Sequence, residues 1–410
     1  MAEILVHRFS NGLVLLGEQL PWLESAAFAL SVPAGAQHDP ADRLGLANLL
    51  CEQVQRGAGE RDSRRFIEDL ERLGVEGSGS ASNAHISFGG AMPAESLIET
   101  LGIYTDVLRR PHLPEDQFDD AVKVCLQELA SLEDDLAQRT LLELKRIHFP
   151  APYGRSVLGT AESLEAMTPA DVERQFRARF HPQGTILSVA GRFEPERLID
   201  AVGQLLGDWQ VPAAPDPIAH PPEHGIRHLS HESSQTHLAI AYPSVAYRDP
   251  EYFLARGAVG VLSDGLSSRL FREVREVRGL CYTVYASLHS LRDRGAVVTY
   301  AGTSAERAQE TLDVTLRLLR ELRDGIDEQE LARLKVQIRS NLVMQQESSR
   351  SRASAIAGDW YHLGQVRTLD RIRELIEGLT VEAIGEFLAE HPPQEFDVVT
   401  LGPNPLEILP

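Results

Sequence analysis

A proline-rich segment near the middle of the chain sets the strongest limit on how it can fold. Residues 211–222 contain five prolines. Proline has no amide hydrogen and cannot continue a helix or a central strand, so this segment should be an extended connector. The 410 residues of the chain are enough for two hydrophobic cores. We therefore predict an N-terminal domain over residues 1–210, a linker over 211–222 and a C-terminal domain over 223–410.

Both halves show the same order of expected elements, in which strands come before long helices. Alternation of apolar and polar residues predicts the strands, and Asp39 followed by Pro40 is typical of a helix start. In the first half the expected strands are Glu3–Phe9, Leu13–Glu18, Ala26–Pro33, Gly74–Met92 and Thr185–Ala190, and the expected helices after Asp39 are Ala94–Leu108, Pro114–Ile147 and Pro169–Arg179. In the second half the expected strands are His237–Tyr242, Tyr282–Leu288, Ala296–Gly302 and Asp397–Leu401, and the expected helices are Pro250–Leu262, Ala305–Arg323, Glu328–Glu347 and Val381–Glu390. This order predicts an α+β fold of two similar domains, each a mixed or antiparallel sheet with helices on one face.

The charge and composition of the chain exclude several classes of partner. The formal net charge is −20, which repels nucleic acid and anionic membrane surfaces. It favours basic peptides, although surface solubility explains it equally well. No apolar run approaches the roughly 20 residues of a membrane helix, and the N-terminus lacks the pattern of a signal peptide. We therefore expect no membrane partner and a cytoplasmic location. Three widely spaced cysteines do not form a disulfide framework.

One expected helix, Gly45–Arg56, places three functional side chains on one side. Asn48, Cys51 and Glu52 occupy positions i, i+3 and i+4, which share a helix face. Two ligands one turn apart with a carboxylate between them is the arrangement that a hydrolytic metal site uses. The alternative interpretation is a solvated polar face on which Cys51 is half-buried.

The residues around this helix resemble the peptidase M16 family, the inverzincins. Gly45–Ala47 before the motif and Arg56–Gly59 after it look like the family pattern Gly-Leu-Ala-His-Phe-Leu-Glu-His followed by a Lys-Gly-Thr turn. In this comparison Asn48 stands in place of the first zinc-binding histidine, Cys51 in place of the general-base glutamate, and Glu52 in place of the second histidine.

The third ligand of the family is a glutamate on a later helix, and Glu128 in Val-Cys-Leu-Gln-Glu-Leu stands at the matching position. Ala121 replaces a residue that is usually acidic. Catalytic zinc needs imidazole or thiolate ligands and a base beside its water, so the resemblance implies a degenerate metal site with no zinc in this chain. A less favoured alternative is an unusual metal site built on Cys51, Glu52 and Glu128.

The second half contains the better-kept motif. Residues 266–286 resemble the M16 pattern Ser-Ser-Arg-Leu-Phe followed by Arg-Glu-x-x-Gly-Leu-x-Tyr, and Arg275 and Tyr282 match its Arg/Tyr pair. In the family this pair stabilises the oxyanion of the bound substrate, a role that suits preorganised donors. The alternative is an Arg275 ion pair with Glu273 or Glu276 and a Tyr282 that belongs to the core.

Two further segments resemble the family. Asn83 and Ala84 match an edge strand that pairs with the peptide substrate by β-augmentation, and an ordinary strand start is the alternative. Residues 153–160 resemble a Pro-x-Gly-x-x-x-x-Gly-Thr segment, for which we expect a structural role.

The resemblance covers nearly the whole chain and implies half of a clamshell that works with a second chain. We expect a non-catalytic subunit of a heterodimeric zinc endopeptidase that acts on peptides. Its partner would carry an intact His-x-x-Glu-His motif and the zinc, and Arg275 and Tyr282 would act in trans. The alternative is a homodimeric pseudo-peptidase or scaffold that binds peptides without cleaving them.

Overall fold

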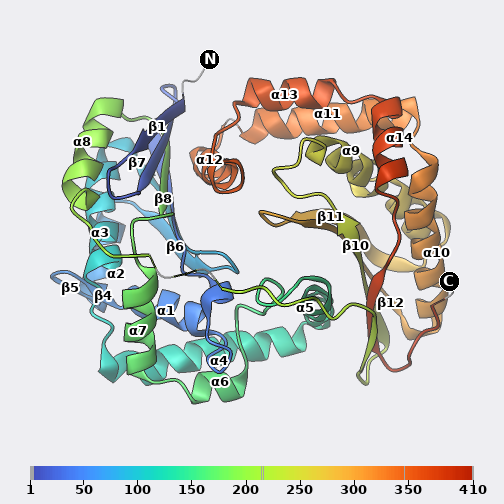
Figure 1. The fold of residues 1–410 in the computed structure, drawn as a ribbon, viewed down its shortest axis with the longest axis horizontal. Coiled ribbons are helices and arrows are strands. Elements are labelled where there is room, and N and C mark those ends of the chain that lie inside the picture. Colours follow the sequence, from blue (N-terminus) through green and yellow to red (C-terminus); the bar gives the residue numbers. More distant parts are fainter. Residues whose placement is uncertain (1–3, 214, 216, 346, 409–410) are drawn as a thin grey trace. The chain divides into compact units, whose positions relative to one another are not determined.

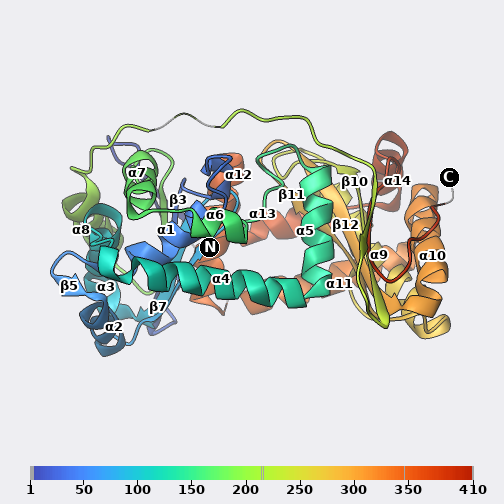
Figure 2. The same ribbon diagram turned by 90° about the horizontal axis from the view of Figure 1, so that it is seen from below.

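The computed structural model describes residues 4–408 except 214, 216 and 346, and the chain forms two compact units. Unit 1 comprises residues 1–131, 151–220 and 345–366, and unit 2 comprises residues 132–150, 221–344 and 367–410. One boundary between the units falls within the proline-rich segment, whose residues 214 and 216 lie outside the described residues. Its described residues up to 219 have no regular secondary structure (Figure 2). The predicted division at 211–222 did not include the two exchanged segments, 132–150 and 345–366.

Unit 1 is built on a mixed six-stranded sheet. Its strands are β1 (Ile4–Arg8), β2 (Val14–Gln19), β3 (Ser25–Val32), β6 (Glu76–Ala81), β7 (Ile86–Pro93) and β8 (Ile186–Gly191), with β4 (Gly57–Ala58) and β5 (Arg61–Asp62) as a separate pair. Its helices are α1 (Leu46–Val54), α2 (Ser63–Arg72), α3 (Leu97–Arg109), α4 (Phe118–Asp134), α6 (Ala161–Glu165), α7 (Pro169–Arg179), α8 (Pro195–Leu206) and α12 (Ser349–Leu363). The strand order is β1-β2-β8-β3-β7-β6, in which β2 and β8 are parallel and the other neighbours antiparallel.

The sheet of unit 1 is covered on both faces. Leu13 and Leu15 belong to the main core, which also contains buried residues of α3 and α8, whereas Val14 and Leu16 pack against Ile356 and neighbours on α12. Figure 1 shows α3 and α8 on one side of this sheet and α12 on the other. The expectation of helices on one face only was therefore wrong for this unit, because a helix from the second half of the sequence covers the other face.

A buried ion pair fixes α12 to the sheet. Arg352 Nε donates to Glu18 Oε2 at 2.8 Å, and Arg352 Nη2 lies 2.7 Å from the same oxygen. The two side chains are only 2% and 4% exposed. Beside them Ser188 Oγ donates to the carbonyl oxygen of Ala353 at 2.6 Å. Removing a charge from water costs free energy unless an opposite charge lies close to it in good geometry. Arg352 and Glu18 can therefore be buried here only as a pair.

Unit 2 is built on a mixed five-stranded sheet. Its strands are β9 (Ile226–Ser230), β10 (Gln235–Ser244), β11 (Cys281–Ser290), β12 (Gly295–Ser304) and β13 (Asp397–Gly402), in the order β11-β12-β10-β13-β9. Its helices are α5 (Leu136–His148), α9 (Tyr252–Ser263), the π-helix η4 (Phe271–Val277), α10 (Ala308–Glu321), α11 (Glu328–Gln345), α13 (Leu369–Glu377) and α14 (Val381–Glu390). β13 and β9 are parallel, and the other neighbours are antiparallel.

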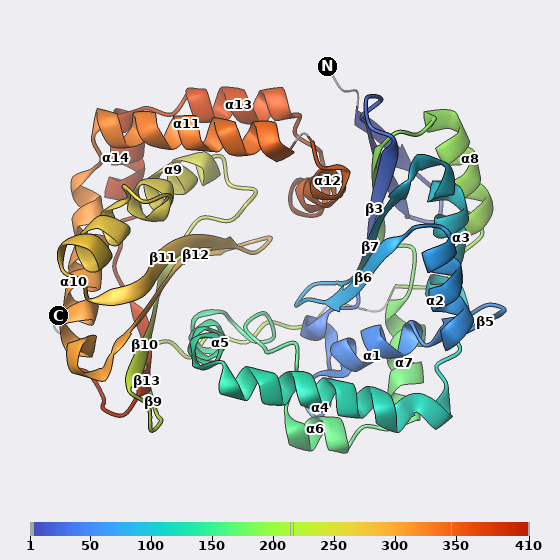
Figure 3. The same ribbon diagram turned by 180° about the vertical axis from the view of Figure 1, so that it is seen from behind.

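Unit 2 repeats the two-faced arrangement with an exchanged helix of its own. Leu238 and Ile240 of β10 belong to the core with α9, α10 and α14 (Figure 3), whereas Ala239 and Ala241 pack against Leu144 and its neighbours on α5. The small side chains on that face leave room for a helix to lie close to the strands. α5 comes from the first half of the sequence.

Most expected strands are confirmed, and the main differences concern helix boundaries. The predicted helix Pro114–Ile147 is two helices, because Asp135 accepts a hydrogen bond from Gln138 N at 3.0 Å and starts α5. The predicted start at Asp39 was wrong, since α1 begins at Leu46. Asp39 still caps α1, with its carboxylate accepting from the amides of Gly45 and Ala47 at 3.0 Å each. The sequence patterns did not predict α2, α8, α12, α13 or β9.

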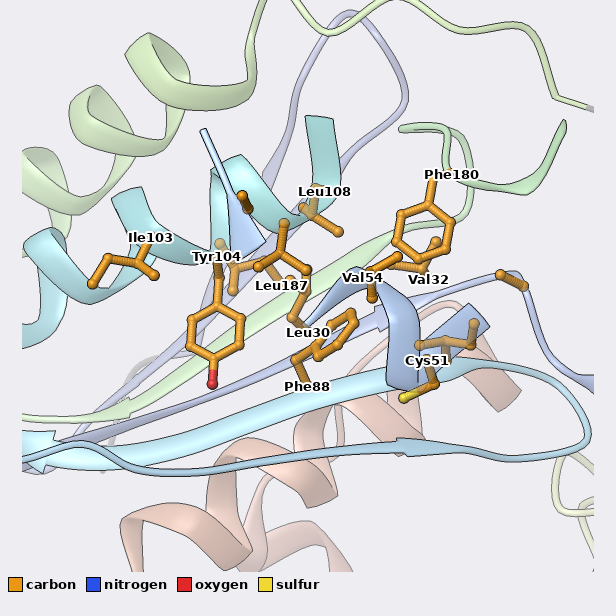
Figure 4. Packing of buried hydrophobic residues seen from close by; sticks show 14 of the residues in the cluster. Leu30, Val32, Cys51, Val54, Phe88, Ile103, Tyr104, Leu108, Phe180 and Leu187 are labelled. Atoms are coloured by element: carbon orange, nitrogen blue, oxygen red, sulfur yellow. The ribbon is translucent and has the colours of Figure 1, made fainter. Parts of the chain in front are cut away.

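Within the described part of the chain, no helix combines the length and apolar character that crossing a bilayer would require. Most large apolar side chains belong to the cores of the two units, as Figure 4 shows for part of unit 1, where side chains such as Leu30, Phe88 and Tyr104 pack together.

We expect Arg352→Met to destabilise unit 1 because it leaves the Glu18 carboxylate buried and unpaired. Removing one partner of a buried pair typically costs about 3–5 kcal/mol, which lowers the melting temperature of a unit of this size by roughly 10 °C. Thermal unfolding followed by circular dichroism measures the change.

Two further variants serve as controls for this prediction. Arg371→Met breaks an exposed pair with Glu374 and should change the free energy of unfolding by less than about 1 kcal/mol. The double variant Glu18→Leu with Arg352→Met should recover most of the loss, because neither charge remains buried. Equal effects of Arg352→Met and Arg371→Met would show that the buried pair has no special role.

Candidate functional site

The start of α1 is fixed by a close approach of two backbones. Gly45 and Gly159 have φ angles of 93° and 71°, which favour glycine. A Cβ atom on Gly45 would lie 2.8 Å from the carbonyl oxygen of Leu158, and one on Gly159 would lie 2.1 Å from the carbonyl oxygen of Leu44. The segment 153–160 therefore has the structural role of holding the first turn of α1 in place.

Asn48 on α1 and Glu128 on α4 contact each other directly. Asn48 Nδ2 donates to Glu128 Oε2 at 2.7 Å and lies 3.7 Å from Cys125 Sγ. The amide thus faces Glu128 with its donor, and a donor N–H cannot coordinate a metal ion. The structure brings together two of the four degenerate positions as a hydrogen-bonded pair.

The other two positions turn to different partners. Glu52 Oε1 forms an ion pair with Arg56 Nη2 at 2.8 Å, one helical turn further on. Cys51 is only 4% exposed, so the expectation of a half-buried thiol was wrong, and its side chain belongs to the core cluster of unit 1 (Figure 4). Burial, together with the nearby carboxylates Glu52 and Glu128, raises the pKa of the Cys51 thiol to about 12.

Cys125 behaves in the same way as Cys51, because burial raises the pKa of its thiol to about 12. Neither thiol is a thiolate at neutral pH, and the thiolate is the metal-binding form. Sequence reasoning missed Cys125 and Arg56 as neighbours of the degenerate positions. The i, i+4 spacing of Glu52 and Arg56 is the signal that predicts their ion pair.

These residues do not fit a catalytic zinc ion. Zinc at such a site requires nitrogen, thiolate or carboxylate ligands that converge on one point. Here the Asn48 amide donates to Glu128, Glu52 is paired with Arg56, and Cys51 is protonated in the core. Within the described residues, the ligand atoms of Cys51, Glu52 and Glu128 do not all lie within 4.8 Å of one another, so the geometry does not support the unusual metal site either.

Arg275 and Tyr282 lie in unit 2 where irregular backbone joins a helix to a strand. Arg275 is in the π-helix η4, and Tyr282 is the extra residue of a β-bulge at the start of β11. Gly279 between them has a φ angle of 59°, as a left-handed turn at a helix end requires. π-Helices and bulges are frequent at functional sites, where they redirect side chains.

The two side chains are stacked and accessible. The guanidinium carbon of Arg275 lies 4.8 Å from the ring centroid of Tyr282 and also 4.8 Å from that of Phe271. Tyr282 is 81% exposed, so the alternative of a core tyrosine was wrong. Among the described carboxylates, including Glu273 and Glu276, none lies within ion-pair distance of Arg275.

The hydrogen-bonding groups of this pair are available. Within the described part of the chain, neither the N–H groups of Arg275 nor the hydroxyl of Tyr282 has a hydrogen-bond partner. Stacking uses the faces of the guanidinium and the ring, which leaves the N–H groups at the edge of the guanidinium free. The segment that carries the pair is anchored in the core by three buried side chains, those of Leu270, Val274 and Leu280. The backbone that carries the donors is therefore well packed.

Asn83 and Ala84 lie in the turn between β6 and β7 and not in a strand. Their carbonyl oxygens already accept hydrogen bonds, from Gln37 N at 2.9 Å and from Gly35 N at 3.3 Å. The edge strand at this place is therefore β6 and does not include Asn83 and Ala84. β6 is the last strand in its sheet and pairs, among the described strands, only with β7. Arg350, which the sequence did not single out, donates to the carbonyl oxygen of Glu76 at 2.6 Å at one end of β6.

Comparisons with known proteins agree with this architecture. Residues 15–161 match the family model described as Insulinase (Peptidase family M16), and residues 166–338 match the model described as Peptidase M16 inactive domain. An uncharacterized zinc protease of Mycobacterium tuberculosis is 28% identical over 408 residues, covering 96% of this chain and 92% of its own. An uncharacterized zinc protease of Bacillus subtilis is 24% identical over 400 residues, covering 96% and 97%.

Two solved structures share the fold. A peptidase M16 inactive domain from Pseudomonas fluorescens superposes with a TM-score of 0.89 at 21% identity over 99% of each chain. A protease from Helicobacter pylori superposes with a TM-score of 0.90 at 17% identity, covering 98% of this chain and all of its own. The predicted α+β fold of two domains, with mixed sheets covered by helices, is confirmed.

We expect the isolated chain to cleave no peptide, whether or not Zn²⁺ is added, because Asn48 and Glu128 bind each other, Glu52 is paired with Arg56 and Cys51 is buried. A set of fluorogenic peptides, assayed with and without 1,10-phenanthroline, measures this activity. The matched variant is Glu128→Gln, which removes the best remaining ligand. Chelator-sensitive cleavage by the wild-type chain that Glu128→Gln abolishes would contradict the prediction.

Proposed function

Because the chain belongs to the peptidase M16 family, we propose that it is the non-catalytic subunit of a heterodimeric zinc endopeptidase. In this proposal Arg275 and Tyr282 complete the active site of a partner chain. The partner carries an intact His-x-x-Glu-His motif, its zinc and its base. The substrate is a peptide.

The observation that carries the proposal is the different state of the two sites. In unit 1 Asn48 is hydrogen-bonded to Glu128, and Glu52 is paired with Arg56. In unit 2 Tyr282 is exposed and Arg275 is half-buried; the two are stacked, and their side-chain donors have no partner among the described residues. A chain with no hydrolytic role at all would have no need for an accessible cation and phenol held in this way.

The chemistry of the pair suits a developing negative charge. When a nucleophile attacks a peptide carbonyl, the carbonyl oxygen becomes an oxyanion, and donors already aimed at it stabilise the transition state. The Arg275 guanidinium is a cation that donates through its free side-chain N–H groups. The Tyr282 hydroxyl donates one further bond. The stacking of the two groups limits their motion, so little rearrangement is required during the reaction.

β6 offers a place to hold an extended peptide. The strand is an edge of its sheet, and its residues 76–80 are exposed. A peptide that adds to such an edge gains backbone hydrogen bonds. In this proposal the segment Glu76–Ala81 takes the binding role that the sequence assigned to Asn83 and Ala84. This edge also favours a second candidate function, a homodimeric pseudo-peptidase that binds peptides without cleaving them.

The test uses this chain together with an M16 chain from the same organism that has an intact His-x-x-Glu-His motif. We expect the mixed pair to cleave peptides. Arg275→Ala and Tyr282→Phe should each lower kcat by about 10²–10³-fold, the usual cost of losing one oxyanion donor. KM should change much less, because these bonds form in the transition state.

Matched controls come from the same segment. Arg272 is exposed and pairs with Glu273, and Tyr285 is on β11 with its ring stacked on Tyr300. Arg272→Ala and Tyr285→Phe should leave kcat within about twofold, since neither supplies a donor to the substrate. If the pair is active and all four variants match the wild type, the role in trans is wrong. If no partner confers cleavage but the isolated chain binds peptides, the pseudo-peptidase is favoured.

A further inference from the structure

Unit 2 contains a cluster of possible metal ligands that is unrelated to the degenerate motif. His148 Nδ1 lies 2.7 Å from Asp397 Oδ2, and His224 Nδ1 lies 2.8 Å from the same oxygen. One ligand atom from each of the three residues lies within 4.8 Å of the other two. The cluster thus offers two imidazole nitrogens and a carboxylate at one point.

Three elements far apart in the sequence position these side chains. His148 is the last residue of α5, Asp397 is the first residue of β13, and His224 precedes β9. The amide of His224 donates to the carbonyl oxygen of Ile147 at 2.9 Å, and the amide of Gly225 donates to Asp397 Oδ1 at 2.5 Å. Backbone and side-chain bonds together therefore hold the loop that carries His224 against the other two residues.

The backbone at His224 is in an uncommon conformation. Its φ angle is 46°, which places a non-glycine residue in the strained left-handed region. Gly225, which follows directly, also has a positive φ angle, of 113°. The strained position directs an imidazole at Asp397, and strain of this kind is typical of functional positions.

The cluster is buried on one side and open on the other. His148 and Asp397 are buried, whereas the side chain of His224 is 55% exposed. The open side of the cluster is therefore the side of His224.

We propose that His148, His224 and Asp397 bind a divalent transition-metal ion such as Zn²⁺, with water completing its coordination. Two imidazoles and one carboxylate suit Zn²⁺, Co²⁺, Ni²⁺ or Fe²⁺ better than Mg²⁺ or Ca²⁺. Ligand atoms of a tetrahedral zinc ion with bonds of about 2.1 Å are roughly 3.4 Å apart. The two imidazole nitrogens, at 2.7 and 2.8 Å from Asp397 Oδ2, therefore have to move away from this oxygen by about 0.6–0.7 Å when the ion enters.

Binding requires a change at the imidazole nitrogens. In the metal-free cluster the Nδ1 atom of each ring is hydrogen-bonded to Asp397 Oδ2. In the metal-bound cluster Nδ1 is a ligand, and the hydrogen is on Nε2 of the same ring. The ion replaces two hydrogen bonds by three coordinate bonds, so it fastens the end of α5 to β13 and to the loop before β9. The site is structural and independent of the proposed peptidase role.

A second group of possible ligands provides an internal comparison. Glu251, Glu390 and His391 also have ligand atoms within 4.8 Å of one another, but Glu390 is exposed and His391 Nε2 is 3.3 Å from Glu251 Oε2. Isolated surface groups of this kind bind metal ions weakly, because water competes for each ligand. We place the metal at the first cluster, where two of the three ligands are already buried.

The test is a titration of the full-length chain, stripped with chelator, with Zn²⁺ and with Co²⁺ alone. We expect one ion per chain, a cobalt absorption spectrum that indicates nitrogen and oxygen ligands, and a rise of several degrees in melting temperature. His224→Gln should weaken binding by at least about 100-fold, since loss of a second-shell partner alone costs about 10–100-fold. His224 is half-exposed, so this variant should fold.

The controls separate this site from the others in the chain. Glu251→Gln disrupts the surface group and Glu128→Gln removes a carboxylate from the degenerate motif, and both should bind metal as tightly as the wild type. Asp397→Asn should also abolish binding, and circular dichroism checks that it is folded. The proposal is overturned if the chain binds no metal, if His224→Gln binds it equally well, or if Glu251→Gln or Glu128→Gln is the variant that loses it.

Discussion

The buried ion pair of Arg352 and Glu18 is the interaction on which the architecture of unit 1 depends. Glu18 stands on a strand that is buried up to its last residue, Gln19, and its carboxylate is tolerated there only with an opposite charge beside it. That charge arrives on α12, from the second half of the sequence. Unit 1 is therefore complete only when residues 349–363 are in place, just as the sheet of unit 2 requires α5 from the first half.

Strands and family could be predicted from the sequence, whereas the exchange of helices could not. Alternation of apolar residues is a local signal, and it located β2, β3 and β10 within a few residues. α12 has no such signal, because its sequence is rich in serine and alanine and its buried face includes Arg352. Residues 114–147 read as one helix because the break at Asp135 is a single residue. Which sheet a helix covers is decided by contacts distant in sequence.

For the candidate site, too, the sequence predicted which residues are involved but not the contacts between them. The sequence motif identified Arg275 and Tyr282. Their stacking depends on a π-helix and a β-bulge, which no residue pattern in the sequence predicts. The motif also identified Asn48 and Glu128 as altered ligand positions. Their hydrogen bond depends on the position of α1 beside α4, which the sequence does not predict. The sequence placed Asn83 and Ala84 in a strand, whereas they lie in the turn that follows β6. Turns and strand ends both contain small and polar residues, so the sequence does not distinguish them here.

The residues at the degenerate metal positions of unit 1 form bonds within the fold, so the absence of the histidine motif costs little stability. The Arg275 and Tyr282 pair of unit 2 differs in this respect. Asparagine at position 48 supplies a donor for Glu128, and glutamate at position 52 supplies an anion for Arg56. Among the described residues, the side chains of Arg275 and Tyr282 contribute no comparable hydrogen bond or ion pair to their own unit. Hydrogen bonding within unit 2 therefore does not account for their presence, whereas the proposed role toward a bound peptide would.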